Sequence, residues 1–360
     1  MSKAYSIEIL AHSSIYKNNY LDNNYKERKL RVDYSEPERI NESTGILLLI
    51  PGYGASIDSN VYKKMRGKFS DLYNLIILQC DYFGSEFMQT PQNDEIGKAI
   101  EETIKYKDSN YLDNKQLVKH FNANIDENID NLNDMGVMQA IDNITAVLAI
   151  INMFRNKGML INIKKVMIYG HSHGAYLAYM CNRFCPQLFQ LIIENSAYIY
   201  PTYLNNIRCL RYEYNSNIIS FDFRYMISNI ENFLGNEIYS LEYLYRNFDN
   251  MCYIVSYHGE LDDMTSLEDK SEFAQNINKM VFMGITKSDI DGEMIKSCRH
   301  SLDADFLMMF DMTYKAFEKK FGQGTDLTIT NLESFVLKDK MKLSICYDTG
   351  FPIIRKVKLT

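Results

Sequence analysis

The chain has 360 residues, with 46% hydrophobic residues, 24% charged residues and a net charge of −7. This composition is typical of a soluble globular protein, and the length accommodates one large domain or two ordinary ones. The negative charge provides no general attraction to nucleic acid or anionic membranes, so neither is expected as a partner. The N-terminus lacks the pattern of a secretory signal, and no apolar run approaches the length of a membrane span.

The seven cysteines are odd in number and scattered along the chain. Cys80, Cys252 and Cys346 lie within apolar, strand-like runs, where a free cysteine behaves as a small hydrophobic residue. Cys181 and Cys185 are one helical turn apart, but no second pair completes a zinc site. We therefore expect a reducing, cytoplasmic compartment, no metal and no other cofactor.

The first third of the chain predicts two kinds of strand. Residues 5–9 and 29–34 alternate apolar and polar side chains, which is typical of half-buried antiparallel strands. Residues 45–51 and 75–78 are continuous apolar runs, which indicate strands covered on both faces. Residues 85–135 are polar and weakly periodic, so we interpret them as an insertion that contains a helix near 94–106.

The middle of the chain contains the strongest helical pattern. Apolar residues recur at spacings of three and four from Val137 to Ile151, and Gly158 ends the run, so a long amphipathic helix is predicted. Apolar strands are predicted near 165–169 and 191–193. Residues 198–250 are rich in Tyr, Asn and Phe and form a second insertion, at the place where a lid would be inserted.

The last part of the chain continues the alternation of strands and helices. Strands at 252–257 and 280–285 enclose a helix near 267–277, and an aromatic-rich helix is predicted to begin near Leu302. This alternation indicates an α/β fold with a mostly parallel sheet flanked by helices. We predict one domain over 1–321, with insertions at about 85–135 and 198–250. Residues 322–360 add a C-terminal strand extension packed on the same domain.

One pentapeptide predicts the chemistry of the protein. Gly170-His171-Ser172-His173-Gly174 follows an apolar strand and precedes a helix-forming run. A strand that turns sharply into a helix needs small residues on both sides of the turn, and Gly170 and Gly174 supply that room. This context defines a nucleophile elbow, in which the hydroxyl of Ser172 is exposed at the tip.

A serine nucleophile requires a base, and the base requires an orienting acid. The expected chain order after an elbow is Ser, then Asp or Glu, then His. Asp262 and Asp263 follow the strand at 252–257, and His300 is the one histidine of six that comes after them on a loop. We therefore predict His300 as the base; the alternative is a surface histidine that caps the helix near Leu302.

The quoted motifs resemble those of the α/β-hydrolase superfamily. The elbow is accompanied by Pro51-Gly52-Tyr53-Gly54, by Asp81-Tyr82-Phe83-Gly84-Ser85 and by His258-Gly259-Glu260-Leu261-Asp262. The resemblance covers roughly residues 28–321. More narrowly, the chain is similar to an uncharacterised bacterial family of hydrolase-like proteins, some of them associated with flagellin glycosylation.

The resemblance implies further roles. The acid that follows His-Gly-x-x is Asp262, with Asp263 as the alternative if the turn is shifted by one residue. An oxyanion needs two backbone N–H donors, of which His173 supplies the one directly after the nucleophile. The family pattern implies Tyr53 for the other, with Gly54 as the alternative.

Two further patterns in the sequence have a structural explanation as well as a functional one. His171 and His173 alternate as metal ligands on a strand do, but they straddle a sharp turn without an acidic cluster, so a structural or substrate-shaping role is favoured. Five tyrosines either line an acyl or sugar pocket or simply reflect a tyrosine-rich chain, which is the interpretation we favour slightly: Tyr198, Tyr200, Tyr203, Tyr212 and Tyr214.

The predicted function is that of an esterase-like serine hydrolase. Ser172 would form an acyl-enzyme with an O-acyl or O-acetyl group of a small-molecule or glycan ester. Acyl transfer by the same triad, a serine peptidase, and a non-catalytic binding protein on this fold are the alternatives, because fold does not imply function. The sequence does not indicate the substrate or the oligomeric state.

Overall fold

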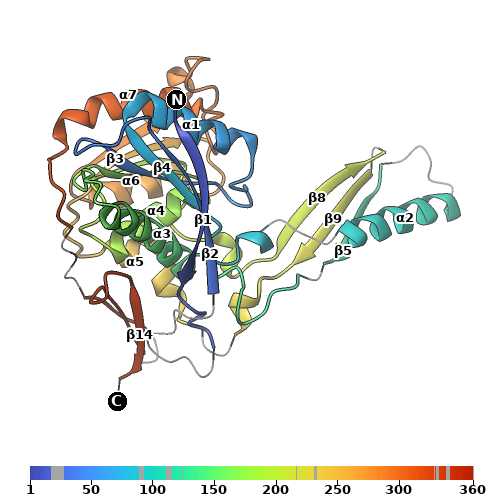
Figure 1. The fold of residues 1–360 in the computed structure, drawn as a ribbon. Helices are drawn as coiled ribbons and strands as arrows, with labels where there is room; N and C mark the ends of the chain where they lie inside the picture. The colour runs from blue at the N-terminus through green and yellow to red at the C-terminus, as the bar shows by residue number, and fades with distance from the viewer. Residues whose placement is uncertain are drawn as a thin grey trace.

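The computed structural model describes residues 1–17, 28–88, 93–110, 116–123, 125–215, 217–230, 233–327, 329, 332–337 and 341–359. Figure 1 shows a body built on a large sheet, a slender arm that projects from it, and a small C-terminal sheet at the lower end of the body.

The central sheet has eight strands in the order β1-β2-β4-β3-β6-β7-β10-β11. β2 is antiparallel to both of its neighbours, whereas the pairs from β4 to β11 are parallel. This topology confirms the α/β class and the mostly parallel sheet. The strands are β1 (Lys3–Ala11), β2 (Arg28–Glu36), β3 (Gly45–Ile50), β4 (Leu75–Cys80), β6 (Val166–His171), β7 (Leu191–Asn195), β10 (Tyr253–Gly259) and β11 (Met280–Ile285).

Helices cover both faces of this sheet. Neighbouring residues of a strand point to opposite faces, and both faces are buried: Leu48 and Ile168 belong to one core, while Leu47 and Met167 belong to the other. The continuous apolar runs follow from this double coverage. The first core includes α3 (Val137–Asn156), α4 (His173–Phe184) and α6 (Leu267–Gln275), and the second includes α1 (Asn60–Tyr73) and α7 (Phe306–Phe317).

Helix α3 differs from its prediction. It is buried around most of its circumference, so the amphipathic interpretation is wrong. It is also long and apolar enough to cross a membrane by length and composition, contrary to the sequence expectation, but its burial is that of a core helix. Its polar side chains are buried because they have partners within the body: Gln139 contacts His173, and Asp142 pairs with Arg28.

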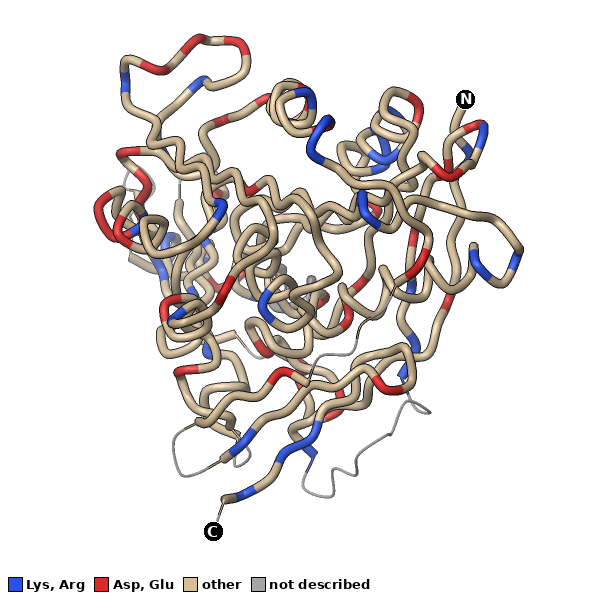
Figure 2. Tube along the Cα trace, turned by 90° about the vertical axis from the view of Figure 1, so that its left-hand side faces the viewer, with Lys and Arg blue, Asp and Glu red and all other residues tan. Residues whose placement is uncertain are grey.

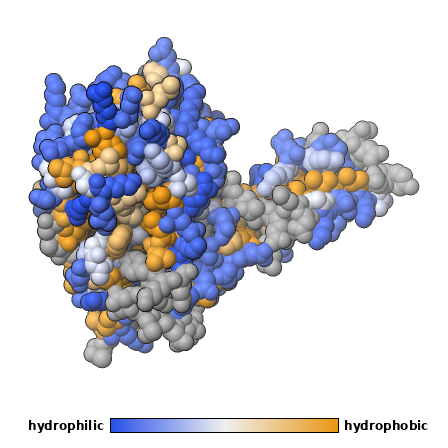
Figure 3. Space-filling model, viewed as in Figure 1, coloured by the Kyte–Doolittle hydropathy of each residue, from blue (hydrophilic) through white to orange (hydrophobic). Residues whose placement is uncertain are grey.

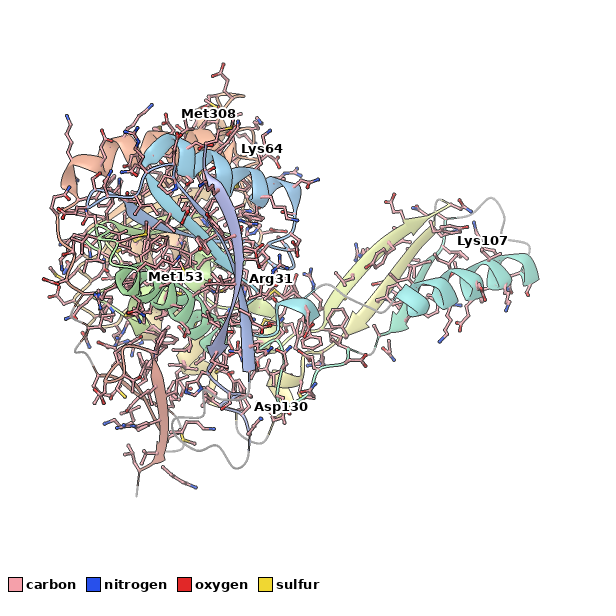
Figure 4. All side chains as sticks on the ribbon, viewed as in Figure 1. Arg31, Lys64, Lys107, Asp130, Met153 and Met308 are labelled. Atoms are coloured by element: carbon pink, nitrogen blue, oxygen red, sulfur yellow. The ribbon has the colours of Figure 1, made fainter. Side chains whose placement is uncertain are left out.

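The two insertions join to form the arm. The first contributes α2 (Asn93–Ser109) and β5 (Val118–Asn122), and the second contributes β8 (Arg208–Tyr214) and β9 (Asn217–Phe223). The strand order is β5-β9-β8, and α2 packs on this sheet through a small core around Ala99, Ile219 and Phe221. Figure 3 shows an apolar stripe on the arm between polar surfaces, and Lys107 on α2 stands well apart from the body (Figure 4).

Other parts of the insertions belong to the first core, among them Leu132, Ile227 and Leu241. Asn236–Tyr239 forms a 3-10 turn, and α5 (Leu241–Tyr245) follows it. Short 3-10 helices lie at Ser85–Phe87, Thr202–Leu204, Met226–Asn229, Asn236–Tyr239, Lys287–Asp289 and Glu318–Lys320.

The C-terminal segment forms a separate antiparallel sheet of β12 (Glu333–Val336), β13 (Met341–Cys346) and β14 (Ile353–Lys358). Leu343 and Ile345 extend the first core, and the hydroxyl of Tyr347 donates to the carbonyl of Phe184 at 2.9 Å. Strand β14 was not predicted from the sequence. Figure 2 shows the basic residues along the chain near the C-terminus.

Candidate active site

The turn between β6 and α4 has the geometry of an elbow. Ser172 has φ +53° and ψ −117°, a strained conformation for a residue with a side chain. A Cβ at Gly170 would lie 2.5 Å from the carbonyl oxygen of Gly174, and one at Gly174 would lie 2.1 Å from that of Ile50. Only glycine fits at either position, so these two residues allow the turn that leaves Ser172 partly exposed.

A continuous chain of hydrogen bonds begins at Ser172. Its Oγ lies 2.8 Å from Nε2 of His300, and Nδ1 of His300 lies 2.9 Å from Oδ2 of Asp262. Asp262 is buried, whereas the neighbouring Asp263 is exposed. The carboxylate that contacts the imidazole is therefore that of Asp262.

The environment of Asp262 favours its charged form. Burial by itself would raise the pKa of this carboxyl, but the hydrogen bond and positive charge of His300, with the charge of His258, outweigh burial and lower the pKa. An ionised Asp262 holds the His300 proton on Nδ1 and leaves Nε2 facing Ser172. This is the tautomer in which Nε2 accepts the serine proton.

The loop that carries His300 is set by a left-handed turn. Ser301, Leu302 and Asp303 have φ of +74°, +58° and +44°. The helix expected near Leu302 therefore begins only at Phe306, where the side chain of Asp305 caps it. His300 does not cap that helix. Instead, the Ser301 N–H donates to Oγ of Ser196 at 2.9 Å, which ties the loop to the end of β7.

The loop that carries Asp262 packs directly on the histidine loop. The Leu261 N–H donates to the carbonyl of Cys298 at 2.8 Å. A Cβ at Gly259 would lie 2.2 Å from that same carbonyl oxygen, so this glycine permits the approach. The imidazole of His258 is buried, and its Nε2 lies 2.9 Å from the carbonyl of Thr265, which fixes the turn that presents Asp262.

The loop after β3 lies beside the elbow because Ile50 pairs with Gly170 in the parallel register. A Cβ at Gly52 would lie 2.8 Å from Nδ1 of His171, so the loop touches the elbow strand. The Gly54 N–H is directed to the sulfur of Met88, at 3.4 Å. Of the two candidate donors in this loop, Gly54 thus already has a partner outside the site.

The candidate oxyanion donors Tyr53 and His173 are linked through their side chains. The imidazole of His173 contacts the hydroxyl of Tyr198 and, at 2.6 Å, Oε1 of Gln139. The Gln139 amide nitrogen donates to Oδ1 of Asn133 at 2.8 Å, and the Asn133 amide donates to the hydroxyl of Tyr53 at 2.7 Å. The rings of Tyr53 and His173 also pack edge to face, with centroids 5.3 Å apart.

These contacts define the state of His173. Burial lowers its pKa to about 3, so the imidazole is neutral. Because Oε1 of Gln139 is an acceptor, Nε2 of His173 carries the proton and Nδ1 accepts from Tyr198. The backbone N–H of His173 lies in the first turn of α4, where the helix dipole is positive.

His171 serves a different part of the site. Its Nε2 lies 2.7 Å from Oγ of Ser301, and burial together with the positive charge of His300 lowers its pKa to about 4. His171 and His173 therefore have separate partners and do not share one ligand position. Their contacts fit the structural or shaping role that the sequence favoured.

The five tyrosines from the second insertion have different surroundings. Tyr198 contacts His173, and the ring of Tyr203 lies 5.7 Å from that of Tyr53, so both adjoin the site. Tyr200 accepts a hydrogen bond from Asn205 at 2.8 Å. Tyr212 and Tyr214 belong to β8 in the arm.

A polar cavity of about 760 Å³ adjoins the loop after β3. Pro51 and Gly54 form part of its wall, and the segment after β4 (residues 81–86) forms another part. Asp130, labelled in Figure 4, lies at its edge and pairs with Lys17.

Several residues of the site carry no local sequence signal. Gln139 lies within the pattern of a helix, and Asn133 lies within the polar, weakly periodic residues 85–135. Their partners His173 and Tyr53 are 34 and 80 residues away. The apolar spacing of α3 places Gln139 on the face opposite the apolar residues, where a polar side chain is expected, so it gave no signal.

Comparison with known proteins gives partial matches. A family model described as "Protein of unknown function (DUF2920)" matches residues 84–233. No curated protein matches the chain. Residues 84–233, which the family model matches, contain the elbow and most of both insertions.

The solved structures to which the chain is similar include esterases and a putative dipeptidyl aminopeptidase. Est1E from Butyrivibrio proteoclasticus is 12% identical, with a TM-score of 0.46 over 83% of this chain and 97% of that chain. Propionate-bound esterase 2 of Thermogutta terrifontis is 11% identical, with a TM-score of 0.47 over 88% of this chain and 97% of that chain. A putative dipeptidyl aminopeptidase IV from Bacteroides ovatus is 11% identical, with a TM-score of 0.48 over 89% of this chain and 36% of that chain. The function proposed below rests on the geometry of the described residues.

Proposed function

We propose that the protein is a serine hydrolase that cleaves an ester through an acyl-enzyme on Ser172. The observation that carries this proposal is the hydrogen-bond chain from Ser172 through His300 to Asp262, at 2.8 and 2.9 Å. It begins at a residue of φ +53° on the turn between β6 and α4. This arrangement provides a nucleophile, a base and an orienting acid within contact of one another.

In the first step, Oγ of Ser172 attacks the ester carbonyl carbon while Nε2 of His300 takes the hydroxyl proton. The carbonyl oxygen becomes an oxyanion, which the backbone N–H groups of His173 and Tyr53 stabilise. A single donor of this kind contributes about 3 kcal/mol to the transition state. Asp262 stabilises the imidazolium that forms.

In the second step, His300 gives its proton to the departing alcohol oxygen, and the acyl group remains on Ser172. Water then attacks the acyl-enzyme, and His300 again serves as base and then as acid. The products are the free acid and the alcohol, and Ser172 is restored.

Pre-steady-state kinetics with p-nitrophenyl acetate test this proposal. Wild-type protein should release a burst of p-nitrophenol of about one equivalent, because an activated aryl acetate acylates the serine faster than water removes the acetyl group. Ser172→Ala should abolish the burst, whereas Ser288→Ala, which alters an exposed serine, should retain it. Equal hydrolysis by wild type and Ser172→Ala would overturn the proposal.

A further inference from the structure

Arg208 begins β8, where the arm leaves the body. The central carbon of its guanidinium lies 5.0 Å from the ring centroid of Tyr53 and 4.5 Å from that of Tyr203. Two aromatic rings therefore hold the planar cation in place. A group fixed in this way loses little conformational freedom when it binds a ligand.

The guanidinium of Arg208 lacks an anionic partner among the residues that the structure describes. Among the described residues it makes no hydrogen bond and no ion pair, and its Nε is buried without an acceptor. Arg208 as a whole is partly exposed. Other well-buried arginines differ: Arg66 pairs with Asp33 at 3.3 Å, and Arg183 pairs with Glu333. An unpaired, partly buried cation is unfavourable, so an acceptor is expected from outside the described chain.

The half-buried carboxylate of Glu127 does not meet this need. Oε1 of Glu127 accepts the N–H of Asn133 at 2.8 Å, and Oε2 accepts the N–H of Met226 at 2.6 Å. Both oxygens are therefore used by the backbone. The charge of Arg208 remains available for a ligand.

The position of Arg208 relates that ligand to Ser172. Tyr53 contacts Arg208 through its ring, and the same ring packs at 5.3 Å on His173, the residue directly after the candidate nucleophile. Two ring contacts thus separate the guanidinium from the residue that follows Ser172.

Resting on the proposed ester hydrolysis, we propose that Arg208 binds a carboxylate carried by the substrate, so that the preferred substrates are small anionic esters. The two terminal nitrogens of a guanidinium match the two oxygens of a carboxylate in geometry and charge. Tyr203 and Tyr53 form the apolar sides of this subsite. The competing explanation is that Arg208 only packs the arm against the body.

Calorimetry on the Ser172→Ala protein, which cannot turn over an ester by the proposed route, separates the two explanations. One probe pair places the charge on the alcohol side: 4-acetoxybenzoate and its neutral amide, 4-acetoxybenzamide. The other places it on the acyl side: 4-(phenoxycarbonyl)benzoate and its neutral amide. The protein should bind the anionic member of at least one pair about 10-fold or more tightly than the neutral member.

Adding Arg208→Gln should remove this preference, and Arg208→Lys should restore only part of it because an ammonium lacks the planar fork. Arg211→Gln, which alters an exposed arginine of the same strand, should leave the preference unchanged. A thermal unfolding midpoint within a few degrees of the parent shows that each variant is folded.

Equal binding of both members in both pairs, or a preference that survives Arg208→Gln, would overturn the assignment of Arg208. Because binding is measured without turnover, this outcome is distinct from failure of the hydrolase proposal. That failure would appear as equal hydrolysis of p-nitrophenyl acetate by wild type and Ser172→Ala, in a protein that still shows the preference.

Discussion

His173 contacts Gln139 through a 2.6 Å hydrogen bond between Nε2 and Oε1, and both side chains are fully buried. Replacing Gln139 by Met keeps the length of the side chain but leaves Nε2 of His173 without its acceptor and removes the amide that donates to Oδ1 of Asn133. We expect a loss of about 1–3 kcal/mol in the free energy of unfolding. We also expect kcat to fall about 10-fold or more with little change in KM, because the two candidate oxyanion donors lose their link.

The control for Gln139→Met is Gln275→Met, at an exposed position at the end of α6. It should leave kcat and urea unfolding unchanged. A Gln139→Met protein that is destabilised but retains full kcat would show that the network supports the fold alone.

The acid of the hydrogen-bond chain can be tested with two adjacent residues. Asp262→Asn keeps the size of the side chain but favours the wrong tautomer of His300, so kcat should fall by about 10³–10⁴. Asp263→Asn alters an exposed carboxylate and should change kcat by less than about 3-fold. Comparable losses in the two variants would contradict the assignment of Asp262.

Gly52 should tolerate no side chain. A Cβ there would lie 2.8 Å from Nδ1 of His171, so Gly52→Ala must displace either the loop after β3 or the elbow strand. We expect at least a 10-fold loss of kcat. Gly97→Ala is the matched control, because a Cβ there meets nothing within 4 Å, and within α2 it should add about 0.5–1 kcal/mol of stability. Unchanged kcat in Gly52→Ala would show that the loop does not support the oxyanion.

Stability should fall in mild acid. The pKa values of His171 and His173 are lowered by burial from 6.5 to about 4 and about 3, so both histidines bind protons more readily in the unfolded chain. The stability they contribute is complete above pH 6.5 and is lost as the pH falls towards 4, by about 3 kcal/mol for His171 alone.

Asp134 opposes this trend. Burial raises its pKa to about 6, so protonation of the folded state between about pH 6 and 4 adds stability as the pH falls. The two histidines outweigh this one carboxyl. Urea unfolding at pH 7.5, 5.5 and 4.5 should therefore show decreasing stability, with a smaller decrease in His171→Gln. A flat profile would contradict the burial of these histidines.

The parts of the fold that follow from local pattern were predictable. Continuous apolar runs located the buried strands, and Gly170 and Gly174 located the turn because nothing larger fits there. The positions of Ser172, Asp262 and His300 on neighbouring loops follow from the rule that parallel strands end at one edge of the sheet.

The remaining features depend on contacts between distant segments. Val118 pairs with Ile218 in the arm, 100 residues away, so neither insertion alone indicates the shared sheet. The left-handed turn at 301–303 contains no glycine, and its backbone is held by contacts with β7 instead. No sequence motif marks Arg208 as a functional residue. Its position between the rings of Tyr53 and Tyr203 becomes evident only in the folded structure.

Labelling with a fluorophosphonate, followed by peptide mapping, tests the central claim most directly. The reagent phosphonylates an activated serine, so wild-type protein should take up one equivalent, located on Ser172. Ser172→Ala should take up none, and His300→Gln should react far more slowly because the hydroxyl has lost its base. No labelling of folded wild-type protein, or equal labelling of Ser172→Ala, would contradict the account.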